Sequence, residues 1–149
     1  MEEIALTIQK CTINDCKYLA ELNKELINAE GSDNPMTVEE LEERMKDFLQ
    51  TFYEAFFFIE QNTVVGYALV KIDCKPLYLR QFMIIHEYRR RHYGEQAFRM
   101  LLSYLKTDFI DIEVLSNNDR GIQFWEKLGF VERHKYMCYK GNRLYENNS

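Results

Sequence analysis

Proline and glycine are scarce in this sequence, which has two prolines and six glycines among its 149 residues. Both prolines, Pro35 and Pro76, lie between segments with regular apolar patterns, and no linker rich in Pro, Gly or Ser divides the chain. Internal repeats and low-complexity tracts are also missing. Because the length fits one unit with a sizeable core, we expect a single domain over residues 1–149.

Long apolar runs are absent as well. The longest stretches, AFFFI and VVGYALV, are much shorter than the roughly 20 residues that a membrane-spanning helix needs. The first ten residues, MEEIALTIQK, carry acids where a secretory signal carries bases, and they contain no long apolar core. With 46% hydrophobic and 29% charged residues, the composition is that of a globular protein. We therefore expect a cytoplasmic protein without a membrane partner.

Patterns that bind metals or nucleic acids are missing too. None of the four cysteines forms a CxxC pair, and the three histidines do not have metal-ligand spacing, so we expect reduced thiols and no metal site. The net charge is −5, and the chain has a single run of three consecutive basic residues, in one short loop, whereas a nucleic-acid-binding protein usually has a broad basic face. The charge pattern favours a small anionic ligand and argues against a nucleic-acid partner.

The apolar periodicity predicts alternating strands and helices. Weak alternation indicates a first strand at residues 4–9, and apolar residues at helical spacing indicate a helix that runs through Leu26. Thr37 and Glu40 form a capping-box pattern, which predicts a second helix ending near Gln50. Two aromatic and β-branched runs that flank Gln61-Asn62 then predict a β-hairpin. The later elements are expected to be a central strand at 77–85, a helix from 93, a strand at 109–115, a helix at 118–128, and one or two strands at 130–140.

This order implies a mixed α/β (α+β) domain. The unit strand, loop, helix, strand at residues 77–115 requires one parallel pair with a right-handed crossover. The other connections favour antiparallel neighbours, so the parallel pair lies inside an otherwise antiparallel sheet.

The sequence YRRRHYGEQAF, residues 88–98, carries the chemistry that is easiest to interpret. It lies between a predicted buried strand and a helix start, where unpaired backbone N–H groups and the helix dipole favour anions. Gly94 permits close approach of a ligand to the backbone, and three consecutive arginines add donors suited to phosphate. The loop predicts a pyrophosphate cradle, although arginines that only solvate a turn are the alternative.

Two blocks of the chain resemble the GNAT N-acetyltransferase superfamily. The family pattern R/Q-x-x-G-x-G/A corresponds to RRRHYG, in which Gly94 is the second glycine and His92 replaces the first. The pattern N-x-x-A-x-x-F-Y-x-x-x-G-F corresponds to residues 118–130, with Gly121 and Trp125 in place of alanine and tyrosine. The resemblance implies a three-layer, GNAT-like fold. Its central sheet would be mostly antiparallel, with six to seven strands, one splayed parallel pair and four flanking helices.

The resemblance also implies a site for acetyl-CoA and direct attack by an acceptor amine on the thioester. In this family the strand before the loop holds the pantetheine arm, the loop holds the pyrophosphate, and the later helix lines the far side. The implied residues are Met83, Ile84 and Ile85 on the strand; Arg89, Arg90, Arg91, His92, Tyr93, Gly94 and Glu95 in the loop; and Asn118, Phe124 and Trp125 on the helix.

The positions at which the family often keeps its acid and base hold other residues here. Trp125 replaces the tyrosine that serves as general acid, and an indole N–H is a poor acid, which leaves Tyr136, Tyr139 or water. The position of the family glutamate falls on Tyr78, which is a poor base near neutral pH. Tyr78 and Tyr139 are therefore the candidate catalytic residues.

Two further positions are candidates for binding the acceptor. Glu30 and Asp33, between the first two helices, could attract a cationic amine, or they could be solvated loop acids. Arg80 and Gln81 are polar residues inside an apolar strand, and burial of an unpaired arginine is costly. We expect Arg80 to bind a substrate carboxylate, with a structural salt bridge as the alternative.

The sequence thus predicts an acetyl-CoA-dependent N-acetyltransferase that acts on a primary amine of a small molecule or another acceptor. A catalytically weak acyl-CoA-binding or regulatory module is the alternative, because the usual acid and base are replaced. The final aromatic-rich segment could pair across a two-fold axis, so both a monomer and a homodimer stay open.

Overall fold

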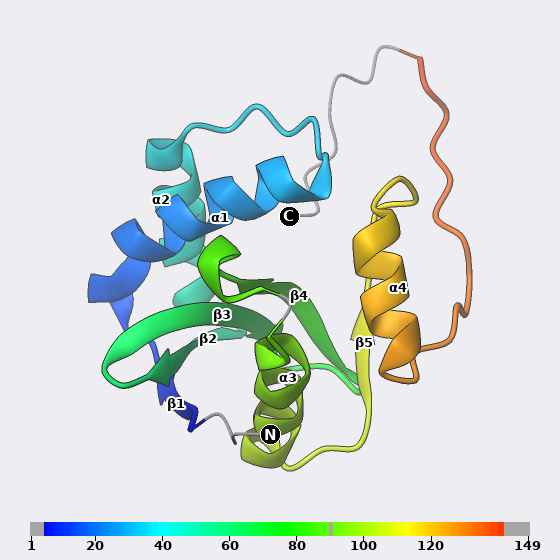
Figure 1. Ribbon diagram of the computed structural model, residues 1–149. Coiled ribbons are helices and arrows are strands. Elements are labelled where there is room, and N and C mark those ends of the chain that lie inside the picture. Colours follow the sequence, from blue (N-terminus) through cyan, green and yellow to red (C-terminus); the bar gives the residue numbers. More distant parts are fainter. Residues whose placement is uncertain (1–4, 90, 142–149) are drawn as a thin grey trace.

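The computed structural model describes residues 5–89 and 91–141 (Figure 1). No helix within these ranges is long and apolar enough to cross a membrane. The elements in chain order are β1 (Thr7–Lys10), a 3-10 turn (Ile13–Asp15), α1 (Cys16–Glu30), α2 (Val38–Leu49), β2 (Tyr53–Glu60), β3 (Thr63–Lys71), β4 (Leu77–Ile84), a second 3-10 turn (His86–Tyr88), α3 (Tyr93–Leu105), β5 (Ile110–Ile112) and α4 (Asp119–Lys127).

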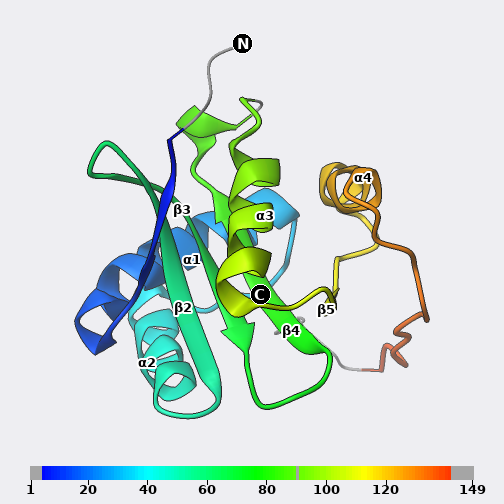
Figure 2. The same ribbon diagram turned by 90° about the horizontal axis from the view of Figure 1, so that it is seen from below.

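The strands form one sheet in the order β1-β2-β3-β4-β5. The first four strands are antiparallel to their neighbours, and β5 is parallel to β4. Helices α1 and α2 cover one face of the sheet, α3 covers the other, and α4 lies beside β5 (Figures 1 and 2). The mixed α/β class, the parallel pair and the four flanking helices are as the sequence predicts.

Apolar side chains fill both spaces between the sheet and its helices. In the run AFFFI, Phe56 and Phe58 pack in the cluster under α3, whereas Phe57 packs in the cluster under α1 and α2. Successive side chains of a strand point to opposite faces, so a continuous apolar run fits a strand that is covered on both sides. The central strands are therefore fixed by packing from both faces.

The helix cap and the hairpin turn that the sequence predicts both form in the structure. Thr37 and Glu40 form the predicted capping box, with N–H donors 2.9 and 3.2 Å from the accepting side-chain oxygens, and α2 ends at Leu49. Gln61 and Asn62 form the turn of the predicted hairpin, with φ of +50° and +65°. Asparagine tolerates this left-handed conformation better than most residues, which suits a two-residue turn.

The predicted count of six to seven strands is wrong for the part of the chain that the structure describes, where the sheet has five. The strand expected at 109–115 shortens to Ile110–Ile112, and residues 131–141 form no strand. A strand needs a neighbour to accept and donate its backbone hydrogen bonds. Residues 131–141 run apart from the sheet (Figure 1), and none of the five described strands pairs with them.

Candidate functional site

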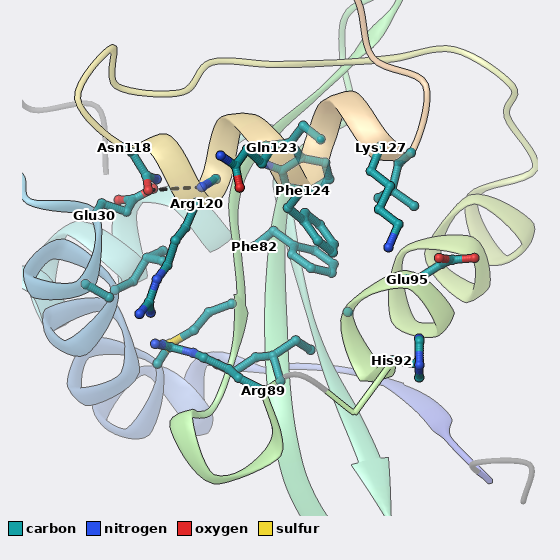
Figure 3. Close-up of a pocket in the computed structure, with 18 residues that line it drawn as sticks. Glu30, Phe82, Arg89, His92, Glu95, Asn118, Arg120, Gln123, Phe124 and Lys127 are labelled. Carbon is teal, nitrogen blue, oxygen red and sulfur yellow. Dashed lines mark hydrogen bonds between the residues drawn. The ribbon is translucent and has the colours of Figure 1, made fainter. Parts of the chain in front are cut away.

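The described residues form an open cavity of about 620 Å³ between the end of β4, the start of α3 and the inner face of α4 (Figure 3). The end of α1 contributes a further part of the lining. The lining residues are Leu26, Ala29, Glu30, Phe82, Met83, Ile84, Arg89, His92, Gly94, Glu95, Asn118, Arg120, Gly121, Gln123, Phe124, Trp125, Lys127 and Leu128.

The cavity forms where the parallel strands β4 and β5 separate. Their last pairing joins Leu79 to Ile112, yet β4 continues to Ile84. On the β3 side, β4 remains paired to its end, with Ile84 opposite Gly66. A Cβ atom added at Gly66 would lie 2.2 Å from the Met83 carbonyl oxygen, so the glycine permits this close pairing. The last part of β4 therefore has one edge held by β3 and the other directed toward the cavity.

The loop that follows β4 provides the floor of the cavity. Arg89 lines it and donates from Nε to the carbonyl oxygen of Ile84 at 2.8 Å, which ties the loop to the strand end. His92 has φ of +66° and is the N-cap of α3, so the chain turns sharply into the helix. The first N–H groups of a helix have no partner within it. Gly94 and Glu95, in that first turn, both line the cavity.

The structure places some of the predicted donor-site residues at the cavity and others away from it. Of the strand and loop residues, Met83, Ile84, Arg89, His92, Gly94 and Glu95 line it. Ile85 and Arg91 do not belong to the lining, and Arg90 lies outside the described residues. Tyr93 is buried, and its hydroxyl donates to Glu60 at the end of β2. Tyr93 thus anchors the start of α3 to the sheet.

Helix α4 forms the wall opposite β4. Asn118 is its N-cap and accepts from the Gly121 N–H at 3.1 Å, as the dashed line in Figure 3 shows. Phe124 stacks on Phe82 of β4 with ring centroids 6.1 Å apart. A Cβ atom added at Gly94 would lie 2.9 Å from the Phe124 ring. Gly94 therefore lets α4 approach the start of α3, besides leaving room above the helix N-terminus.

Trp125 both lines the cavity and packs in an aromatic cluster. Its ring lies 5.3 Å from Phe82, 5.5 Å from Phe98 and 5.2 Å from Phe130, measured between centroids. These edge-on contacts connect α4 to β4 and α3. The packing supports a structural role for the indole at the position where the family often has a tyrosine.

Glu30 is the acidic residue that the end of α1 contributes to the lining. Burial raises the pKa of its carboxyl group to about 7, since desolvation disfavours the charged form. Figure 3 shows Glu30 at the same end of the cavity as Asn118 and Arg120. Gly31 follows with φ of +71° and ends the helix, which fixes the position of Glu30. Asp33, the other acid that the sequence suggests for binding a cationic amine, does not line the cavity.

The two candidate catalytic tyrosines, Tyr78 and Tyr139, do not line the cavity. The Tyr78 hydroxyl donates to Glu113 Oε1 at 2.8 Å, and neither residue lines the cavity. Burial and this carboxylate raise the pKa of Tyr78 well above its usual range. The side chain of Tyr139 is 92% exposed and also does not contribute to the lining. The structure does not bring either tyrosine to the cavity within this chain.

Arg80 is the extra residue of a β-bulge. Pairing between β3 and β4 passes from Val70–Leu79 to Leu69–Gln81, which leaves Arg80 between them. Its guanidinium lies 4.9 Å from the centroid of the Phe48 ring, and Nη1 donates to the Tyr53 hydroxyl at 3.4 Å. Arg80 thus packs toward α2 and does not line the cavity. Bulges re-aim side chains, which explains an arginine within an apolar strand.

Next to the bulge, a buried chain of hydrogen bonds connects the sheet to α1. Tyr67 donates to Gln81 Oε1 at 2.8 Å, and Gln81 Nε2 donates to Asn23 Oδ1 at 3.4 Å. The same Asn23 oxygen accepts from Arg44 Nη2 of α2 at 3.1 Å. Since α1 carries Glu30, this chain fixes the α1 wall relative to β4.

Several lining residues were not predicted from the sequence. Arg120, Gln123 and Lys127 occur at helical spacing and share the cavity face of α4, and this periodicity is the signal that could have identified them. Phe82 of β4 lines the cavity too, but its sequence context is that of any core strand. Leu26 and Ala29 of α1 carry no such signal either.

Solved structures and a family profile are similar to this chain. No curated protein matches the chain. Among solved structures, a possible acetyltransferase from Clostridium difficile 630 is 16% identical and covers 93% of this chain and 98% of its own, with a TM-score of 0.75. AAC(6')-Iy in complex with the bisubstrate analog CoA-S-monomethyl-acetylneamine is 14% identical over 93% and 99% of the two chains, with a TM-score of 0.69. A predicted acetyltransferase with acetyl-CoA from Clostridium acetobutylicum is 15% identical over 91% and 96%, with a TM-score of 0.70.

These structures share the fold of this chain. The sequence profile of the acetyltransferase (GNAT) family matches residues 19–130, which extend from α1 through α4 to Phe130. The matched range contains both blocks of sequence on which the resemblance was based. The chain therefore belongs to the GNAT family of acetyltransferases, which are N-acetyltransferase enzymes.

Proposed function

We propose that this protein transfers the acetyl group of acetyl-CoA to a primary amine. The observation that carries the proposal is the separation of β4 from β5 after the Leu79–Ile112 pairing, next to the N-terminus of α3. The structural neighbours with a CoA-based bisubstrate analog and with acetyl-CoA support it.

The cavity fits an acyl-CoA in shape and in chemistry. The free edge of β4 at Met83 and Ile84 offers backbone groups to the amides of an extended pantetheine arm. The first turn of α3, with Gly94, offers unpaired N–H groups and the positive end of the helix dipole to a pyrophosphate. Arg89 and Arg120, which line the same cavity, add positive charge.

Glu30 is the general base of the proposed reaction. When bound, acetyl-CoA supplies a thioester whose C–S bond breaks as the amine nitrogen forms the new C–N bond. The attacking amine must lose a proton, and a carboxylate with a pKa of about 7 is well matched to accept it near neutral pH. The position of Glu30 at the α1 end of the cavity directs the amine to that side.

No general acid is assigned among the residues that line the cavity. Trp125 packs in the aromatic cluster, and Tyr78 is bonded to Glu113. Water therefore protonates the departing thiolate in this proposal.

Donor binding is tested by a thermal melt with CoA and with acetyl-CoA, followed by an amine screen for acetyl transfer. A ligand at about 100 times its dissociation constant stabilises the folded state by roughly 2.7 kcal/mol. Arg89→Gln should weaken the shift, and Lys106→Gln, at the far end of α3, is the matched control. If neither ligand shifts the wild-type melting temperature, the proposal is wrong.

The amine screen separates the two functions that the sequence left open. Acetylated product with at least one amine supports the enzyme. A clear shift with acetyl-CoA and no product with any amine favours an acyl-CoA-binding module, to which the replacement of the usual acid by Trp125 already points.

A further inference from the structure

Two arginines lie beside one aromatic ring between α2 and the bulge of β4. The guanidinium carbon of Arg44, on α2, is 5.4 Å from the centroid of the Phe48 ring, and that of Arg80 is 4.9 Å from it. Arg80 Nη1 also donates to the Tyr53 hydroxyl at 3.4 Å. All four residues are half-buried, so solvent still reaches them. Guanidinium groups have planar donor forks that match a carboxylate, and this arginine pair is therefore well suited to bind one.

The arginine pair is supported by a buried polar layer. Asn23 Oδ1 accepts from Arg44 Nη2 at 3.1 Å and from Gln81 Nε2 at 3.4 Å. Asn23 and Gln81 are 0% and 2% exposed. Asn23 Nδ2 is buried and has no hydrogen-bond partner among the residues that the structure describes. A buried donor that the fold does not satisfy is costly, and it is typical of a place that a bound molecule completes.

The same faces of α1 and β4 line both the cavity and the buried polar layer. On α1, Leu26 and Glu30 line the cavity, and Asn23 lies about one turn before Leu26 on the same side of the helix. On β4, Met83 lines the cavity, and Gln81 is two residues earlier on the same face of the strand. The polar layer is therefore next to the α1 end of the cavity.

Tyr67 of β3 connects the arginine pair to Glu30. Its hydroxyl donates to Gln81 Oε1 at 2.8 Å. Burial raises the pKa of this hydroxyl well above its usual range, the Glu30 carboxylate raises it further, and the Arg44 guanidinium lowers it. Electrostatic effects decrease with distance, so Glu30 and Arg44 both lie close to the Tyr67 hydroxyl. An acid from α1 and a base from α2 thus face the same region.

We propose that Arg44 and Arg80 bind a carboxylate of the acceptor, so that the acceptor is a small amine that also carries a carboxylate, such as an amino acid. At neutral pH an amino acid has one positive and one negative end. The ammonium group lies at Glu30, which accepts its proton, and the carboxylate lies at the arginine pair. The inference rests on the proposed acetyl transfer, because it names the class of amine that receives the acetyl group.

The proposal is tested with pairs of acceptors that differ only in the carboxylate. Amino acids and the amines that result from their decarboxylation form such pairs, for example lysine and cadaverine, or phenylalanine and phenethylamine. For each pair, kcat/KM of acetyl transfer from acetyl-CoA is measured with both members. The best amino acid should exceed its amine by about 10–100-fold, the usual contribution of a hydrogen bond to a charged group. Equal values for both members of every pair would overturn the proposal.

Substitutions separate carboxylate binding from a structural role. Arg44→Gln and Arg80→Gln should each raise KM for the amino acid and leave the decarboxylated amine unaffected, whereas loss of a structural contact would affect both acceptors alike. Arg80→Lys keeps the charge without the fork and should retain part of the preference. Lys46→Gln is the control, since Lys46 lies on the same helix but pairs with Glu42 and Glu43. A preference that survives both glutamine variants would overturn the proposal.

Binding is measured separately, so that a failure of the proposed reaction does not decide this inference. The same amino acids and amines are added in a thermal melt of the protein with CoA. At least one amino acid should raise the melting temperature more than its amine does, and Arg80→Gln, which lies outside the hydrogen-bond chain through Asn23, should abolish the difference. Such a shift without acetylated product would contradict the transfer and support the carboxylate site. No shift with any amino acid would overturn the carboxylate site, whether or not plain amines are acetylated.

Discussion

The two sides of the cavity are built differently. On the side of β2, β3 and β4, the strands are eight or nine residues long, and buried side chains pack on both faces. On the other side, β5 has three residues, and α4 has no buried residue. One wall of the cavity therefore belongs to the core, and the other rests on aromatic contacts.

The difference in packing between the two walls implies that the α1 wall is rigid and that the α4 wall can move. The α1 wall is fixed by the hydrogen-bond chain from Tyr67 through Gln81 to Asn23, in addition to apolar packing. Helix α4 is held by Phe124 and Trp125, whose rings are half-buried. Elements with few buried contacts open most readily. We expect ligand entry to displace α4 rather than α1.

The largest expected effect concerns Glu30, on the well-packed side. Glu30→Gln should lower kcat/KM by about 10²–10⁴-fold, the usual contribution of a general base. The rising limb of the wild-type pH profile, with an apparent pKa of about 7, should disappear in the variant. Steady-state kinetics between pH 5 and 9 provide the measurement.

Glu30→Gln should lower the activity but raise the stability of the folded protein above neutral pH. Burial raises the pKa of Glu30 from 4.5 to about 7, so the folded state binds its proton more tightly than the unfolded state. The wild-type protein therefore loses stability as the pH rises from about 4.5 to 7, and Glu30→Gln avoids that loss. The variant should melt higher than the wild type at pH 8 and not at pH 4. Glu25→Gln, exposed on the same helix, is the control for both measurements.

A pair of phenylalanine truncations tests the contrast between the walls directly. Phe58 of β2 is fully buried, and Phe58→Ala should cost about 3–5 kcal/mol of unfolding free energy. Phe124 of α4 is half-buried, and we expect Phe124→Ala to cost only about 1–2 kcal/mol, because fewer contacts are lost. Urea unfolding measures both. Equal costs would mean that α4 is part of the core, and the contrast would be wrong.

Features that depend on neighbouring residues could be predicted from the sequence. The capping box of Thr37 and Glu40 and the turn at Gln61-Asn62 are local, and both form as expected. The loop before α3 could be identified for the same reason, since a strand end, basic residues and Gly94 occur within a few positions. Arg89, His92, Gly94 and Glu95 indeed line the cavity.

Features that depend on strand register or on long-range packing could not be predicted. The bulge at Arg80 arises from pairing with β3, and it directs the guanidinium toward Phe48. Tyr78 meets Glu113 because β4 and β5 are parallel neighbours at that level. The high pKa of Glu30 requires burial by elements far away in sequence. The pattern of residues 130–140 predicts a strand, but residues 131–141 form none, because a strand also needs a partner edge that the pattern does not specify.

The smallest expected effect concerns His92, where the chain passes from the well-packed β4 into α3. Its φ of +66° and ψ of 9° are left-handed, a conformation that costs most residues about 1–2 kcal/mol and glycine almost nothing. Glycine also has more freedom to lose on folding, so His92→Gly should raise the unfolding free energy by only about 0.5–1 kcal/mol. His92→Ala keeps the Cβ atom and should give no gain in urea unfolding. If both variants were equally stable, the backbone at this position would not be strained. The glycine of the family pattern would then serve the approach of the ligand rather than the stability of the loop.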